Sequence, residues 1–253
     1  LGRDIIGSKE TVKGLKKNDF LLYRDIHYYS DNIVVSVAGG VTQERVMALA
    51  EKYFSDIAKT GKVEEEAFKF NDKQVKPAVL LKTRKNEQAH LIMGVSCGQR
   101  GNNQRYVEAV LSSILGAGMS SRLFIEIRER RGLAYSIRTS IERYVETGEL
   151  ATYAGVEVAK IDEAIKVMLD QYYGLGSGKY PLFDKELSKA KEYLKGHLAL
   201  SLEDSREINN LYVESELMLG RIDTLEEVFT AMDKVTAKGV VEVAKKLFVP
   251  QKM

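Results

Sequence analysis

The stretch with the clearest chemical potential is MSSRLFIEIRERRGLAYSI, residues 119–137. It contains Arg122, Arg128, Arg130 and Arg131, and Tyr135 follows after a glycine. Guanidinium and phenol groups both donate hydrogen bonds, so they could bind nucleic acid, a phosphate group or another kind of ligand. The rest of the sequence must decide among these ligands.

The sequence argues against nucleic acid and against a nucleotide bound by a glycine-rich loop. The formal net charge is only +2 over 253 residues, and two glutamates interrupt the arginines, so the excess positive charge of a nucleic-acid-binding protein is missing. The Gly-Ala-Gly run at 116–118 lacks the third glycine of a dinucleotide-binding fingerprint, because Ser121 stands there, and no G-K-[ST] phosphate loop occurs. We expect these glycines to end one helix and turn into the next.

Metal ligands are sparse. His27, His90 and His197 lie far apart, and none has a second histidine or a glutamate one turn away on a helical face. The single cysteine, Cys97, excludes an internal disulfide and a cysteine-rich metal site. The sequence therefore predicts no metal site within the chain.

A helix is expected to carry Arg128. Ser120 or Ser121 can cap it, and Leu123, Phe124 and Ile127 share one face, with Arg128 one turn after Phe124. A glycine at 132 is expected to end the helix in the left-handed conformation.

A strand is expected to carry Tyr135. Residues 133–141 alternate, which places Tyr135 on the same side as Ile137 and Thr139. Two donors on neighbouring rigid elements can converge on one ligand atom. The spacing leaves another interpretation open, a solvated arginine-rich helix end beside a tyrosine that packs on its sheet.

The wider pattern indicates αβ units. Apolar runs at 33–38, 89–97 and 150–158 predict strands, each followed by a helical pattern, and a long helix is expected from Asp184 past residue 215. Residues 15–33 align with 235–253 without a gap at an offset of 220. Either two amphipathic helices match by chance, or an αβ domain is duplicated.

Residues 119–137, together with Gly118, resemble the second-domain signature of the insulinase/pitrilysin family of zinc metallopeptidases, especially its mitochondrial-processing-peptidase-like and bacterial members. Residues 1–41, EQAHLIMGV and DKELSKAKEYLKGHLALSLE are similar to other parts of the family, so the resemblance covers essentially the whole chain. It implies an α+β fold of duplicated αβ domains, each a mostly antiparallel sheet packed against helices.

The resemblance also implies a division of the chain. Residues 1–60 would be the C-terminal remnant of the first, zinc-site domain, 61–77 a linker, and 78–253 the second domain without its last strand. The chain opens on Leu1 rather than Met, as expected of a piece of a longer protein.

Roles follow from the same resemblance. Family peptidases bind zinc through an inverted H-x-x-E-H motif in the first domain, which this chain lacks, so no catalytic residue, metal ligand or cofactor is expected here and the zinc belongs to the parent enzyme. An arginine and a tyrosine seven residues apart in the second domain hydrogen-bond the substrate peptide, and Arg128 and Tyr135 match them.

The expected function is the substrate-binding, C-terminal portion of a zinc metalloendopeptidase that cleaves peptides in an enclosed chamber and is inactive alone. The alternative is a non-catalytic partner or structural subunit of the family. Expected partners are a peptide substrate and either a second copy or a metal-bearing domain or subunit, with no nucleic acid and no membrane span. The expected location is the bacterial cytoplasm.

Overall fold

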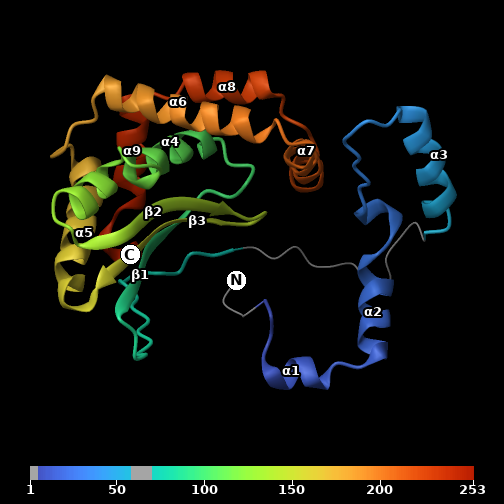
Figure 1. The fold of residues 1–253 in the computed structure, drawn as a ribbon, viewed down its shortest axis with the longest axis horizontal. Coiled ribbons are helices and arrows are strands. Elements are labelled where there is room, and N and C mark those ends of the chain that lie inside the picture. Colours follow the sequence, from blue (N-terminus) through green and yellow to red (C-terminus); the bar gives the residue numbers. More distant parts are fainter. Residues whose placement is uncertain (1–4, 58–69) are drawn as a thin grey trace. The chain divides into compact units, whose positions relative to one another are not determined.

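The computed structural model describes residues 5–57 and 70–253, which divide into two compact units (Figure 1). The first unit falls within residues 1–67 and takes in 204–217. The second comprises 68–203 and 218–253. The buried core lies in the second unit.

A three-stranded antiparallel sheet forms the centre of the second unit. It consists of β1 (Gln88–Cys97), β2 (Ala134–Arg143) and β3 (Gly148–Glu157), in the order β1-β3-β2. The two strands expected near 89–97 and 150–158 are therefore confirmed. The predicted fold class, a mostly antiparallel sheet packed against helices, is confirmed as well.

Helices cover one face of this sheet. α4 (Arg105–Gly116), α5 (Ile161–Ser177) and α9 (Ala237–Leu247) pack against the strands, while α6 (Asp184–Ser201) and α8 (Leu225–Asp233) contact α4 (Figure 1). The largest buried side chains are Tyr172, Leu111, Leu115, Leu123, Ile127 and Leu150. Each such aliphatic side chain contributes roughly 1.5–3 kcal/mol when fully buried.

The opposite face of the sheet carries side chains that remain exposed. Ile92 on β1 is 71% exposed, and its cross-strand partner Tyr153 on β3 is 37% exposed. Arg138 on β2, opposite Tyr153 on the other side, is exposed too. This uncovered surface is called the open face below.

A glycine allows α4 to approach the sheet closely. A Cβ atom on Gly116 would lie 2.2 Å from the Thr139 hydroxyl oxygen and 2.5 Å from the Thr139 backbone nitrogen. The Gly-Ala-Gly run does end this helix, and Gly118 adopts a φ of 108° in the turn that follows. The run therefore acts in packing and chain reversal, as expected.

The first unit contains α1 (Lys9–Gly14), α2 (Lys17–His27), α3 (Gln43–Phe54) and most of α7 (Ser205–Leu219). None of the residues described in these four helices is buried. The Ser36 hydroxyl donates a 2.6 Å hydrogen bond to Asn209 of α7. That contact spans 173 positions of the chain.

Two predictions in this region are wrong. Residues 33–38 form no strand, and Val35 and Val37 are 46% and 53% exposed, because the described residues of this unit offer no second strand to pair with. The long helix from Asp184 does not continue past residue 215. It ends at Ser201, and α7 begins after Asp204, whose carboxylate accepts a hydrogen bond from the Arg206 backbone N–H at 2.8 Å.

The repeat at an offset of 220 is reproduced in the local structure. The bounds of α2 plus 220 are those of α9, and the 3₁₀ turns η1 (Ser30–Asn32) and η4 (Pro250–Lys252) show the same offset. At the helix ends, Tyr28 and Phe248 each donate a backbone hydrogen bond to the carbonyl four residues earlier. The repeated segment is thus a helix, an aromatic residue and a turn.

Of the linker predicted at 61–77, residues 61–69 lie outside the described part of the chain. The boundaries proposed near residues 60 and 78 stay predictions. Among the described residues, no helix combines the length and apolar character needed to cross a membrane.

Candidate functional site

Arg128 lies in a turn with an unusual backbone. The segment η2 (Phe124–Glu129) is π-helical, and the Arg130 N–H donates to the carbonyl of Ile125, five residues earlier, at 2.9 Å. The turn that follows it closes at Gly132, which adopts the expected left-handed conformation with a φ of 58°. Single π-helical turns are frequent at functional sites because they displace a side chain from the regular helical spacing.

The start of this segment differs from the prediction. The Ser121 hydroxyl does not accept a hydrogen bond as a cap. It donates to the carbonyl of Gly118 at 2.6 Å, and so stabilises the turn after α4.

The guanidinium of Arg128 is exposed and has no acidic partner in the described part of the chain. Its central carbon lies 5.0 Å from the ring centroid of Phe124, one turn earlier. A contact of this kind contributes roughly 0.5–1 kcal/mol at an exposed site and leaves the N–H donors free. Arg128 is therefore held in place without being neutralised.

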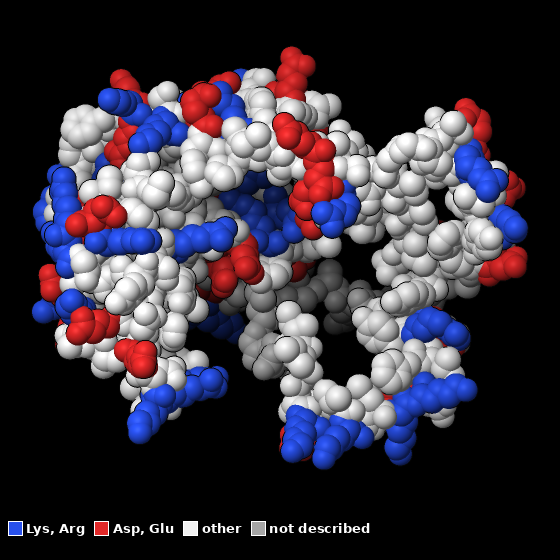
Figure 2. Space-filling view, viewed as in Figure 1, with Lys and Arg blue, Asp and Glu red and all other residues white. Residues whose placement is uncertain are grey.

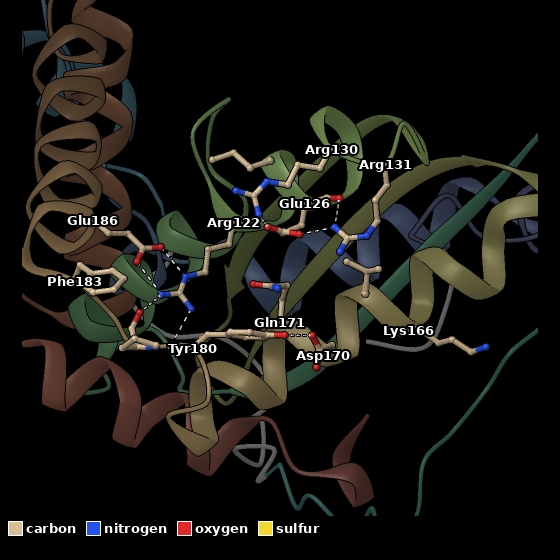
Figure 3. Close-up of a pocket in the computed structure, with 13 residues that line it drawn as sticks. Arg122, Glu126, Arg130, Arg131, Lys166, Asp170, Gln171, Tyr180, Phe183 and Glu186 are labelled. Carbon is tan, nitrogen blue, oxygen red and sulfur yellow. Dashed lines mark hydrogen bonds and ion pairs between the residues drawn. The ribbon is translucent and has the colours of Figure 1, made fainter.

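The other three arginines of the stretch are occupied. Arg122 donates to both carboxylate oxygens of Glu186, at 2.6 and 2.8 Å, and to the carbonyls of Tyr180 and Pro181 (Figure 3). Arg130 and Arg131 both bind the carboxylate of Glu126. These ion pairs distinguish three structural arginines from Arg128.

The same three arginines line a cavity of about 690 Å³ formed by η2, α5 and the start of α6. Across it, Asp170 accepts hydrogen bonds from Lys179 and Tyr180, which hold the Asp170 pKa below its ordinary value. Lys166 points away from this network (Figure 3). Most charges of the cavity thus neutralise one another, so we assign it no ligand.

Tyr135 occupies a β-bulge. Ala134 pairs with Val156 and Ser136 with Gly155, so Tyr135 is the extra residue without a cross-strand partner. It is 73% exposed, whereas Ile137 is 7% exposed. The predicted alternation, which placed these two side chains on one side of the strand, is therefore wrong. Bulges next to functional sites often redirect a side chain in this way.

The residues described here do not fit a zinc site. The His27, His90 and His197 rings each lie against a tyrosine, at centroid distances of 4.2, 6.0 and 4.3 Å. Across the described ranges, no three His, Cys, Asp or Glu side chains are grouped so that they could hold a metal ion. Burial raises the pKa of Cys97 to about 12, and the nearby Glu108 carboxylate adds to the shift, so its thiol stays protonated.

One contact between polar side chains was not predicted from the sequence. The Nδ1 atom of His90 lies 2.8 Å from the Tyr153 hydroxyl on the open face, a contact that the sequence does not predict. Both residues occupy outward positions of two neighbouring strands, and this alternation is visible in the sequence. To predict the contact, the register of the two strands would also have to be known, and this register pairs His90 with Gly155.

Charge on the visible surface gives no support to a polyanion site. On the face shown in Figure 2, acidic and basic side chains are intermixed over the helices of the second unit. This agrees with the low net charge of +2.

Comparison with known proteins decides the family. The family model of the Peptidase M16 inactive domain matches residues 14–194. The chain belongs to the M16 peptidase family. The prediction of an insulinase-family chain is thereby confirmed, and this M16 chain corresponds to the part of the family that is named inactive.

Curated relatives carry zinc-protease names. This M16 chain is 32% identical to the uncharacterized zinc protease YmxG of Bacillus subtilis, over 98% of the chain and 59% of the relative. It is also 32% identical to the uncharacterized zinc protease SCO5738 of Streptomyces coelicolor, over 97% of the chain and 54% of the relative. The chain thus spans a little more than half the length of these relatives.

Solved structures share the fold. A protease from Helicobacter pylori superposes with a TM-score of 0.87 at 18% identity, covering 98% of this chain and 60% of that one. A chain of complex III2 from Candida albicans gives a TM-score of 0.79 at 20% identity, covering 97% and 59%. A peptidase M16 inactive domain from Pseudomonas fluorescens gives 0.80 at 18% identity, covering 97% and 58%.

Proposed function

We propose that this M16 chain is the substrate-binding, C-terminal part of a zinc metalloendopeptidase that cleaves peptides in an enclosed chamber. Zinc would be bound by residues outside the chain, which does not cleave peptides by itself. The bacterial zinc-protease names of the relatives support this reading. A peptide is the substrate, and the bacterial cytoplasm is the proposed location.

One observation carries the proposal. Arg128 and Tyr135 match the family's arginine and tyrosine in type and spacing, and each lies on a backbone irregularity that exposes it. A π-helical turn carries the arginine, and a bulge removes the tyrosine from the buried alternation. A π-helical turn and a bulge each interrupt the regular backbone hydrogen bonds of their element, and both are frequent next to functional sites. Their occurrence seven residues apart, at Arg128 and Tyr135, supports a functional role for these two side chains.

The chemistry of the two groups suits a peptide. A guanidinium keeps its positive charge, and a phenol donates one hydrogen bond, so together they can hold a peptide carbonyl oxygen and stabilise negative charge that develops on it. Removing one such donor from an enzyme typically lowers turnover by about 10²–10³-fold. The proposed role of Arg128 and Tyr135 is therefore substrate positioning and stabilisation of the oxyanion.

A partner is part of the proposal. Phe20, Tyr23 and Tyr28 are each 60–63% exposed in the first unit. Aromatic surface of this extent favours contact with a further domain, with a second copy or with a metal-bearing subunit. The second candidate function is a non-catalytic partner or structural subunit of the same family.

The test uses the zinc-loaded protein that carries this chain. Arg128→Ala and Tyr135→Phe should each lower kcat by about ten- to a thousandfold, with zinc content and circular dichroism unchanged. Arg130→Ala is the matched control. Arg130 lies two residues from Arg128 but is bound to Glu126, so its removal should change kcat less than about twofold.

Two results would count against the proposal. If both variants retained near-normal turnover, the assignment of Arg128 and Tyr135 would be wrong. If the wild-type protein cleaved no peptide but assembled with a separate peptidase subunit, the non-catalytic function would replace it.

A further inference from the structure

Glu126 is the acidic residue inside the π-helical turn that carries Arg128. Its side chain is 17% exposed, and its carboxylate binds two arginines, Arg130 at 2.5 Å and Arg131 (Figure 3). The Arg131 guanidinium also donates to the backbone carbonyl of Glu126 at 2.8 Å. Arg131 thus binds both the side chain and the main chain of the residue five positions earlier. This contact between Glu126 and Arg131 is called the Glu126 clasp.

The spacing of the Glu126 clasp matches the widened turn. In a regular α-helix, side chains three and four residues apart are neighbours, whereas residues five apart point about 140° away from each other around the axis. In a π-helical turn the backbone bonds join residues five apart, as the Arg130 N–H and the Ile125 carbonyl do at 2.9 Å. The clasp therefore favours the π-helical form over the regular one. The pair of Glu126 and Arg130, four residues apart, suits either form.

The clasp and Arg128 lie on different sides of the segment. Glu126 and Arg131 line the cavity of about 690 Å³ against α5, and Arg128 does not. Phe124, the ring over which Arg128 lies, lines a second cavity of about 720 Å³, which is bordered by α4, β2 and α6. The clasp therefore acts on Arg128 through the backbone of the turn and not by contact.

The inner side of the segment is fixed by other contacts. Leu123 and Ile127 are fully buried, and Arg122 is bound to the start of α6. On the outer side, Arg128 itself is held by its contact with the Phe124 ring, which is a weak interaction at an exposed site. The form of the turn between these anchors thus depends on the clasp.

We propose that Glu126 is a positioning residue. Through its clasp with Arg131 it keeps the turn π-helical, and so keeps the Arg128 guanidinium directed toward the ligand group that Tyr135 binds. The inference rests on the proposed function, in which Arg128 and Tyr135 hold one peptide. Loss of the clasp lets the turn adopt regular helical bonds, which moves Arg128. Tyr135 stays in place, because the residues on both sides of it are paired with β3.

The first measurement follows the Arg128 side chain directly. The protein that carries this chain is prepared with isotope-labelled arginine, and the Nε–Hε signal of Arg128 is assigned by its absence from the Arg128→Ala variant. The Phe124 ring shifts this signal, so the signal reports where the guanidinium lies. Glu126→Ala and Arg131→Ala should each move or broaden it. Arg130→Ala is the matched control and should leave it in place, since Arg131 still binds Glu126.

The second measurement asks whether this position serves the reaction. In the zinc-loaded protein, Glu126→Ala should lower kcat about tenfold and change KM less than about twofold, because a small displacement of an aligned group lowers turnover strongly. Glu126→Gln keeps an acceptor oxygen for Arg131 and should recover part of the loss. In an Arg128→Ala background, Glu126→Ala should change kcat by less than about twofold, because the group that it positions is gone.

Two results would overturn the positioning role. One is an Arg128 signal that stays unchanged in both Glu126→Ala and Arg131→Ala. The other is an equal loss of kcat from Glu126→Ala in the wild-type and Arg128→Ala backgrounds, which is the behaviour of a residue that only stabilises the fold. Failure of the proposed function looks different. Arg128→Ala would then leave kcat near normal, while the Arg128 signal still decides whether Glu126 fixes that side chain.

Discussion

Arginines that look equivalent in the sequence are made different by the acids that the fold brings to them. Arg122 meets Glu186 from the start of α6, and Arg130 and Arg131 share Glu126. Arg128 meets only the ring of Phe124 among the described residues. An exposed guanidinium without an acidic partner among the described residues is the arrangement expected of a ligand-binding group.

Cys97 gives a prediction at the same scale. Burial, followed by the charge of Glu108, raises its pKa from 9.0 to about 12, so at pH 8 the thiolate fraction should be about a thousandfold below that of an ordinary cysteine. Alkylation by iodoacetamide should therefore be at least about a hundredfold slower in the folded chain than in guanidinium chloride.

The measurement is unambiguous because the chain has one cysteine. The unfolded chain serves as the control for reagent activity. Similar alkylation rates in the folded and unfolded states would show that the thiol is neither buried nor protonated as described.

At the scale of elements, hydrophobic periodicity predicted strands β1 and β3 and the helices that follow them, because the buried residues of each element recur at its own regular spacing. Leu123 and Ile127 are fully buried, as their helical spacing required. Gly132 ends its segment in the left-handed conformation because few other residues adopt it cheaply. The positions of Arg128 and Tyr135 at a helix end and in the following strand could therefore be predicted.

The bulge, the break between α6 and α7 and the missing strand at 33–38 could not be predicted, because each depends on residues outside its own element. The bulge at Tyr135 is set by the register of β2 against β3, and an alternating pattern cannot reveal an extra residue. The break between α6 and α7 comes where α7 joins the first unit. Residues 33–38 have the composition of a strand, but an isolated strand gains no cross-strand hydrogen bonds.

At the scale of the whole molecule, the repeat places identical elements in opposite environments. Phe248 after α9 is 4% exposed and stacks on Tyr172 at a centroid distance of 4.4 Å. Its counterpart in the repeat, Tyr28 after α2, is 63% exposed. The sequence revealed the repeat, but only the packing shows which copy has a core.

This contrast predicts a difference in stability. Phe248→Ala should lower the free energy of unfolding of the second unit by about 3–5 kcal/mol, because it empties a packed aromatic site. Tyr28→Ala should change it by no more than about 0.5 kcal/mol, as is usual for an exposed position.

Hydrogen exchange of the β3 amides measures this difference, since the slowest amides of a core strand report its global opening. Tyr28→Ala is the matched control at the equivalent position of the repeat. Equal acceleration by the two substitutions would mean that the copies do not differ in packing as described.

The central claim is that Arg128 and Tyr135 bind the same group of a peptide, and a double-mutant cycle on the zinc-loaded protein that carries this chain tests it most directly. The account predicts that Arg128→Ala and Tyr135→Phe combined reduce kcat/KM by less than the product of the two single losses. The expected coupling is about 0.5–3 kcal/mol. Single losses that multiply fully would show that the two side chains act independently, and the absence of any loss would show that they do not bind substrate.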